Sequence, residues 1–179
     1  MQKYHEMTIC GLTRHLPICR LNDHLSIAGF VIFGDAELTV AAAEALLKKA
    51  PDFDVIITAE AKGIPLAHEM SRQSGKKYLV ARKYPKLYME APVSVEVRSI
   101  TTDKVQTLYL DGPEMALMQG KRVLLIDDVI STGESLAALE ALVKNVDCEI
   151  VGYGCILAEG DAAKRADIFY LEELPLFFD

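Results

Sequence analysis

The stretch from Val123 to Ser135 limits the possible folds of this chain more than any other part of the sequence. It reads V-L-L-I-D-D-V-I-S-T-G-E-S: an unbroken apolar run, two adjacent acids, and then small residues that carry hydroxyl groups. Four apolar residues in a row are typical of a strand that is buried on both faces, as in a parallel sheet covered by helices. The helix expected after the turn has its apolar residues on one face, namely Leu136, Leu139, Leu142 and Val143.

The order of strand, turn and helix also occurs earlier in the chain. Residues 54–59 form a short β-branched run, a helix is expected from Pro65 until Gly75, and residues 77–81 form the next strand. Asp35 is expected to cap a further helix, which runs through Lys49. Alternation of this kind predicts an α/β fold in which a parallel sheet carries helices on both faces.

Two regions depart from this alternation. Residues 1–34 show no strong helical period and are expected to form a small hood over the edge of the sheet, so that the core comprises residues 35–179. Within the core, V-S-V-E-V at 93–97 and T-L-Y-L at 107–110 predict a two-stranded ribbon. Because long excursions from compact domains are usually functional, residues 84–110 are interpreted as a flexible lid.

Composition narrows the function classes. The 179 residues include 19 Lys and Arg against 26 Asp and Glu, a net charge of −7, which disfavours a nucleic-acid partner. Apolar runs stay well short of membrane-spanning length, and the first ten residues lack a signal-peptide core, so we expect a cytoplasmic protein without a membrane partner. The four cysteines show no metal-ligand spacing and are expected to be reduced thiols.

The acids and the hydroxyl-rich turn point to a ligand that combines a polyol with a phosphate. Asp127 and Asp128 follow a strand of a parallel sheet, and ligands bind at the carboxyl ends of such strands. Carboxylates accept hydrogen bonds from vicinal hydroxyls, whereas a helix N-terminus favours phosphate. The alternative is a solvated acid pair with a capping Thr132. A Walker-type loop is set aside because Glu134, and not lysine, follows Gly133.

These motifs resemble those of the type I phosphoribosyltransferases, which bind 5-phosphoribosyl-1-pyrophosphate (PRPP). The signature lies in residues 123–135, and Glu60-Ala61-Lys62-Gly63 resembles the pyrophosphate loop of the family, which often holds a cis peptide bond that does not involve proline. Ala81-Arg82-Lys83 resembles a motif of the purine members. With F-G-D-A-E-L at 33–38, the similarity to adenine phosphoribosyltransferases and their xanthine-using relatives covers nearly the whole chain.

The resemblance implies a type I phosphoribosyltransferase fold and a set of PRPP ligands. Asp127 and Asp128 are expected to bind the ribose, with Asp127 also holding Mg²⁺, and the turn is expected to bind the 5-phosphate. The residues assigned to PRPP are Glu60, Ala61, Lys62, Gly63, Asp127, Asp128, Val129, Ile130, Ser131, Thr132, Gly133, Glu134 and Ser135. Because members of the family are commonly dimers, a homodimer is expected as well.

Four residues are expected to act in the transfer reaction: Arg82, Lys83, Lys86 and Glu96. The cations would stabilise the departing pyrophosphate, since the reaction develops negative charge there. Glu96 matches a glutamate that lies near the purine in adenine phosphoribosyltransferases, and it would handle a purine proton. The alternatives are a solvated basic edge and an ordinary exposed strand glutamate.

The purine is expected to lie against Ile130 of the turn and against the segment from Pro17 to Arg20, in particular Ile18 and Arg20. Adenine is favoured because Gly160 follows Glu159 where xanthine-type relatives place a lysine donor, although Lys164 could reach in from a loop. The expected activity is therefore the transfer of the phosphoribosyl group from PRPP to adenine. Transfer to xanthine or another 6-oxopurine, and a PRPP-sensing regulator without activity, are the alternatives.

Overall fold

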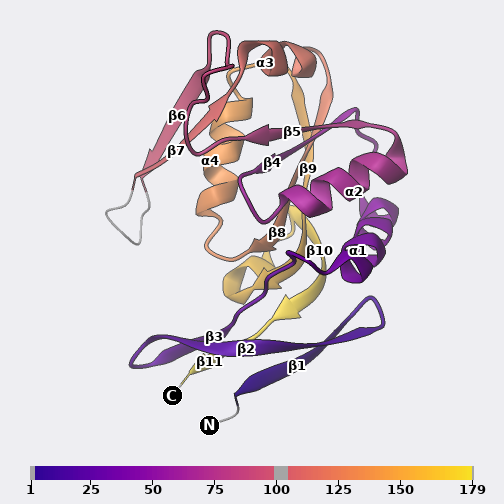
Figure 1. Cartoon of the computed structure of the whole chain (residues 1–179), viewed down its shortest axis with the longest axis vertical. Coiled ribbons are helices and arrows are strands. Elements are labelled where there is room, and N and C mark those ends of the chain that lie inside the picture. Colours follow the sequence, from indigo (N-terminus) through magenta and orange to yellow (C-terminus); the bar gives the residue numbers. More distant parts are fainter. Residues whose placement is uncertain (1–2, 99–104, 179) are drawn as a thin grey trace.

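The computed structural model describes residues 3–98 and 105–178, and a five-stranded parallel sheet forms the centre of the molecule (Figure 1). The strand order is β10-β9-β8-β4-β5, with every neighbouring pair parallel. The strands are β4 (Val55–Ala59), β5 (Lys77–Ala81), β8 (Arg122–Ile130), β9 (Glu149–Glu159) and β10 (Ile168–Leu174). A one-turn helix, η1 (Gly160–Lys164), connects the last two.

Helices cover both faces of this sheet. On one face, α1 (Ala36–Lys49) and α2 (Ile64–Ser74) pack against a core that includes Leu124 and Ile126 of β8. On the other face, α4 (Glu134–Val143) packs against a second core. The alternation of β8 side chains between two apolar cores explains why its apolar run is continuous. The predicted α/β fold class is confirmed.

Local signals set the ends of these helices much as expected. The Asp35 carboxylate caps α1 by accepting the Leu38 N–H at 3.0 Å. Helix α2 has proline in its first turn and ends at Gly75, whose φ is +71°. Strand β8, however, continues four residues past the predicted end at residue 126. It does so because residues 127–130 remain paired with the buried segment 155–158 of β9. The two acids therefore belong to the strand and not to the loop.

The hood is a four-stranded antiparallel sheet built from both ends of the chain. Its strands are β1 (Tyr4–Ile9), β2 (Leu12–Asn22), β3 (Leu25–Ala28) and β11 (Leu176–Phe178), in the order β1-β2-β3-β11. The pairing of β11 with β3 was not predicted from the sequence. Arg14 of β2 links the hood to the core through ion pairs with Asp35 at 2.6 Å and Glu37 at 2.8 Å. The division of the chain at residue 34 stays a prediction.

The predicted ribbon is formed by β6 (Val93–Arg98) and β7 (Val105–Leu110), which pair antiparallel. Residues 99–104 of the expected lid lie outside the described residues. The ribbon packs on α4: Leu108 and Leu110 are fully buried in the core that α4 covers. A short helix, α3 (Gly112–Met118), follows the ribbon and was not predicted. In the described part of the chain, no helix has both the length and the apolar character needed to cross a membrane.

Candidate active site

A cavity of about 390 Å³ opens at the carboxyl ends of the parallel strands, between the core and the hood. Ligands of parallel α/β sheets bind at this edge. Residues from seven separate segments line the cavity: Ile27, Ala28, Gly29, Phe30, Ala59, Glu60, Ala61, Lys62, Lys83, Gln106, Asp127, Asp128, Val129, Ser131, Ser135, Glu159 and Leu174. The cavity therefore brings together the predicted pyrophosphate loop, the acid pair and part of the hydroxyl-rich turn.

The two acids lie at the centre of the sheet edge, near the end of β8. Asp128 is buried, with 3% of its surface exposed, and Asp127 is half-buried. Lys62 Nζ lies 3.0 Å from Asp128 Oδ2, yet this oxygen accepts no hydrogen bond from the described residues. Asp127 Oδ1 accepts the backbone N–H of Asp128 at 2.9 Å. The pair thus retains acceptor capacity that faces the cavity.

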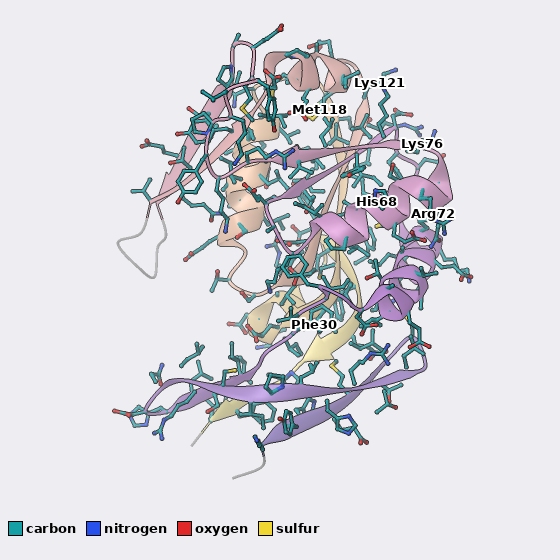
Figure 2. All side chains as sticks on the ribbon, in the orientation of Figure 1. Phe30, His68, Arg72, Lys76, Met118 and Lys121 are labelled. Carbon is teal, nitrogen blue, oxygen red and sulfur yellow. The ribbon has the colours of Figure 1, made fainter. Side chains whose placement is uncertain are left out.

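Lys62 connects the acid pair with the hood. Its Nζ donates to the carbonyl oxygen of Phe30 at 3.4 Å, in addition to the ion pair with Asp128. Figure 2 shows Phe30 where the chain passes from the hood to the core. A cation at this place lies beside the acids and beside the hood, so it can contact an anionic group bound between them.

Burial and the neighbouring carboxylate of Asp128 raise the pKa of Asp127 above its ordinary value of 3.8, and the positive charge of Lys62 opposes this effect. A carboxyl whose pKa is raised on folding binds more protons in the folded than in the unfolded state, so the stability falls as the pH rises between the two values. An uncharged side chain at position 127 does not lose this stability as the pH rises.

Asp127→Asn is therefore expected to increase the free energy of unfolding of the ligand-free protein at pH 8, and the gain is expected to shrink as the pH falls toward 4. Urea unfolding of both proteins across this pH range measures the difference. A variant that is less stable than the original protein at every pH contradicts the burial argument.

The loop after β4 approaches the acid pair closely. The peptide bond between Glu60 and Ala61 is cis, as the resemblance implies for this loop. Glu60 Oε2 accepts the backbone N–H of Lys83 at 3.0 Å, which joins the ends of β4 and β5. A Cβ atom at Gly63 would lie 2.2 Å from Thr58 Oγ1 and 3.1 Å from Asp127 Oδ1. Only glycine lets the backbone pass this close to the acid.

The hydroxyl-rich turn surrounds a smaller hollow of about 40 Å³ beside the main cavity, lined by Asp127 and residues 129–136. Gly133 precedes α4 with φ +80°, a left-handed conformation that glycine adopts without strain. The Thr132 hydroxyl accepts the N–H of Glu134 at 3.4 Å. The first N–H groups of a helix have no intrahelical partner, so this hollow suits a small anion such as phosphate.

Among the described residues, no group of three or more His, Cys, Asp or Glu side chains could hold a metal ion by itself. Mg²⁺ is commonly bound by one or two carboxylates together with the phosphates of a substrate. Asp127 and Asp128 fit such a shared site, since Asp128 Oδ2 accepts no hydrogen bond from the part of the chain that the structure describes. The protein can therefore contribute to binding a magnesium ion that is completed by the ligand.

The four residues expected to act in the reaction do not all lie at the cavity. Lys83 lines the cavity, whereas the described lining includes neither Arg82 nor Lys86. The backbone of Arg82 pairs with Tyr109 through two hydrogen bonds of 2.8 Å, which fastens the ribbon to the end of β5. Glu96 is exposed and lies on the face of β6 opposite to the apolar residues that pack on the core. Among the described residues of the ribbon, Gln106 lines the cavity.

The predicted purine-binding residues do not come together in the cavity. Ile18 pairs with Ala28 inside the hood, and the Arg20 side chain donates to the carbonyl oxygens of Asn22 and Asp23 in the next turn. Ile130 is buried and lines the smaller hollow instead. The hood contributes residues 27–30 to the cavity, which no sequence signal marked.

Two further lining residues were not predicted as site residues, although a signal existed. Glu159 is the last residue of β9 and Leu174 is the last residue of β10. The two residues are partners in the register of these strands. Side chains at the carboxyl ends of parallel strands are expected to meet at one edge of the sheet. Glu159 therefore lies at this edge for the same physical reason as the acid pair.

Comparison with known proteins agrees with this geometry. Residues 35–174 match the model of the phosphoribosyl transferase domain. A hypoxanthine/guanine phosphoribosyltransferase of Methanosarcina acetivorans is 37% identical over 123 residues, which cover 69% of this chain and 59% of that protein. One of Methanotorris igneus is 39% identical over 114 residues, covering 63% of this chain and 58% of its own length. The chain thus spans less than two thirds of these relatives.

Solved structures share the fold. Adenine phosphoribosyltransferase from Thermoanaerobacter pseudethanolicus superposes with a TM-score of 0.67 at 20% identity, covering 96% of this chain and 95% of that one. The enzyme from Saccharomyces cerevisiae, solved with adenine and an iminoalditol bisphosphate, gives 0.63 at 19% identity, with coverage of 95% and 92%. The match of the domain model to most of the sequence and the shared fold lead to one conclusion: this chain belongs to the phosphoribosyl transferase domain family.

Proposed function

We propose that this protein transfers the 5-phosphoribosyl group of PRPP to a purine base and releases pyrophosphate. The observation that carries the proposal is the single cavity in which the acid pair, two lysines and the hydroxyl-rich turn face one another. Each of these groups suits a different part of PRPP. The match to the phosphoribosyl transferase domain supports the same conclusion.

The position of each group suggests how PRPP lies. Asp127 and Asp128 accept hydrogen bonds from the two ribose hydroxyls, and the hollow before α4 takes the 5-phosphate. Lys62 and Lys83, from the ends of β4 and β5, then lie on the side of the pyrophosphate. A bound Mg²⁺, shared between Asp127 and the ligand, would supply further positive charge for the leaving group.

The chain's own residues have two tasks in the transfer. The bond between carbon 1 of the ribose and the pyrophosphate oxygen breaks while the bond to the purine nitrogen forms, and negative charge grows on the leaving group. Lys62 and Lys83 stabilise that charge from the ends of β4 and β5. The acid pair orients the ribose so that its carbon 1 faces the base, and correct orientation alone can lower a barrier by about 7–11 kcal/mol.

We propose adenine as the base. A 6-oxopurine carries an acceptor oxygen on carbon 6, and an unpaired buried acceptor costs about 1–3 kcal/mol. The donor that could have met it, Lys164, is paired with Asp161 at 2.7 Å and lines a different cavity, on the other side of Leu174. Adenine carries an amino group at that position and needs no such donor. The names of the similar solved structures are in line with this choice.

A second candidate is transfer to hypoxanthine or guanine. The relatives with 37% and 39% sequence identity carry that name, whereas the adenine enzymes are similar in structure at about 20% identity. Both candidates use the same PRPP site and differ only at the base. A PRPP-sensing regulator without activity is not favoured by any relative reported above.

Pyrophosphate release tests the proposal. The protein is incubated with PRPP, magnesium and one base at a time from adenine, hypoxanthine, guanine and xanthine. Release that depends on adenine supports the proposed activity, and release only with a 6-oxopurine supports the second candidate. PRPP binding without release from any base contradicts the transferase and indicates the regulator.

We propose a homodimer and a cytoplasmic location on the resemblance to the family. The role of residues 84–110 as a lid stays a prediction, because residues 99–104 lie outside the described chain. The proton-handling role of Glu96 requires the ribbon to move, since this side chain is exposed on the outer face. Arg82 and Lys86 stay candidates that would approach the pyrophosphate on such a movement.

A further inference from the structure

The order of the strands indicates where the base lies, provided that the proposed function holds. From one side of the sheet edge to the other, the lining residues follow the order Leu174 of β10, Glu159 of β9, the acids of β8, and then the ends of β4 and β5 with their lysines. If the ribose lies on the acids and the pyrophosphate faces the lysines, carbon 1 is attacked from the opposite side. The base therefore lies toward β9 and β10.

This end of the cavity is largely apolar. The hood contributes Ile27 and Ala28, and β10 contributes Leu174, which is 3% exposed. A flat aromatic base gains about 25 cal/mol for each Å² of apolar surface that it buries in such a slot. Ionisable side chains on this side of the acids are limited, among the described lining residues, to Glu159.

The surroundings of Glu159 suit a residue that binds a small molecule in the cavity. Glu159 is half-buried at the end of β9, where its backbone belongs to the sheet, and its carboxylate makes no hydrogen bond or ion pair with the described residues. Burial raises the pKa of its carboxyl, and the charge of Lys62 opposes this. A partly buried carboxylate without a donor is unfavourable, so a ligand that brings an N–H group to it gains binding energy.

We propose that Glu159 determines the choice of base by accepting a hydrogen bond from the amino group on carbon 6 of adenine. The amino group offers two N–H donors at this place. A 6-oxopurine instead presents an oxygen, which a carboxylate repels. Glu159 is thus a specificity-determining residue that deepens the proposed function and has no part in holding PRPP.

The test uses Glu159→Gln, which keeps the size of the side chain and replaces the charged acceptor with an amide that can also donate. Since a hydrogen bond to a charged group contributes about 1.5–3 kcal/mol, kcat/KM for adenine is expected to fall roughly 10- to 150-fold. The kcat/KM for hypoxanthine is expected to be unchanged or higher. The ratio of kcat/KM for adenine to kcat/KM for hypoxanthine therefore falls at least as much as the value for adenine. Calorimetry with magnesium and PRPP is expected to give an unchanged Kd.

Glu172→Gln is the matched control, because Glu172 is exposed on the neighbouring strand β10 and does not line the cavity. It is expected to leave both values of kcat/KM unchanged. An unchanged adenine-to-hypoxanthine ratio in Glu159→Gln overturns the inference while the proposed function stands. Loss of PRPP binding in this variant also overturns it, since Glu159 would then belong to the sugar site. Failure of the unaltered protein to use any base instead removes the proposed function.

Discussion

Replacing both Asp127 and Asp128 with asparagine is expected to weaken the binding of PRPP, in the presence of magnesium, by roughly 100- to 10,000-fold. Each carboxylate is expected to accept a hydrogen bond from a ribose hydroxyl, and a hydrogen bond to a charged group contributes about 1.5–3 kcal/mol. Two such bonds amount to about 3–6 kcal/mol, at about 1.4 kcal/mol for each tenfold change in Kd. Turnover is expected to fall at least as far, because the ribose also loses its orientation.

The double variant is expected to remain folded, because neutral side chains remove the repulsion between the buried Asp128 and the adjacent, half-buried Asp127. Circular dichroism and urea unfolding check this directly. Asp23→Asn is the control, since the Asp23 side chain is 94% exposed in the turn of the hood and does not line the cavity. Unchanged PRPP affinity in the folded double variant would show that the acid pair does not bind the sugar.

Gly63→Ala is expected to have the second large effect. The added Cβ would lie 2.2 Å from Thr58 Oγ1, a buried hydroxyl on β4 that cannot move away without disturbing the sheet. Overpacking of this kind typically costs about 1–3 kcal/mol of stability. The loop that carries Lys62 has to shift as well, and a displacement of about 1 Å near the reacting groups can cost roughly 100-fold in rate.

Urea unfolding measures the loss of stability, and pyrophosphate release measures the loss of rate. Gly29→Ala serves as the stability control, because a Cβ there would meet its nearest neighbour, Cys19 Sγ, at an ordinary 3.4 Å. The backbone of neither glycine is in the left-handed region, so the comparison isolates the steric effect. If Gly63→Ala is as stable and as active as the original protein, the close approach between this loop and Asp127 is not required.

The sequence predicted the part of the fold that local patterns encode. The apolar run of β8, the proline and glycine at the two ends of α2, and the capping carboxylate of Asp35 each act within a few residues, and the structure places these elements as expected. The acid pair and the loop at 60–63 could be placed together because the carboxyl ends of neighbouring parallel strands share one edge.

Non-local pairings could not be predicted in this way. The hood is completed by β11, which lies more than 140 residues from its partner β3, and nothing in either strand specifies the other. The wall that the hood contributes to the cavity, residues 27–30, depends on that arrangement. The predicted wall residues Ile18 and Arg20 belong to the adjacent strand, whose register with β3 places them elsewhere.

Two other omissions had a signal in the sequence. Helix α3 begins with Asp111 and Glu114 in a capping box and with proline in its first turn, which is a recognisable start for a helix. Its seven residues are too few for a helical period to stand out. Glu159 ends a parallel strand, as the acid pair nearly does, and the edge rule applies to it equally.

Titration of the unaltered protein with PRPP, followed by calorimetry with and without magnesium, tests most directly whether the cavity is a PRPP site. Saturable binding of one PRPP per chain, stronger with magnesium than without it, is the result that the acid pair, the lysines and the turn before α4 predict. Absence of binding in both conditions, from a protein shown to be folded, would contradict it.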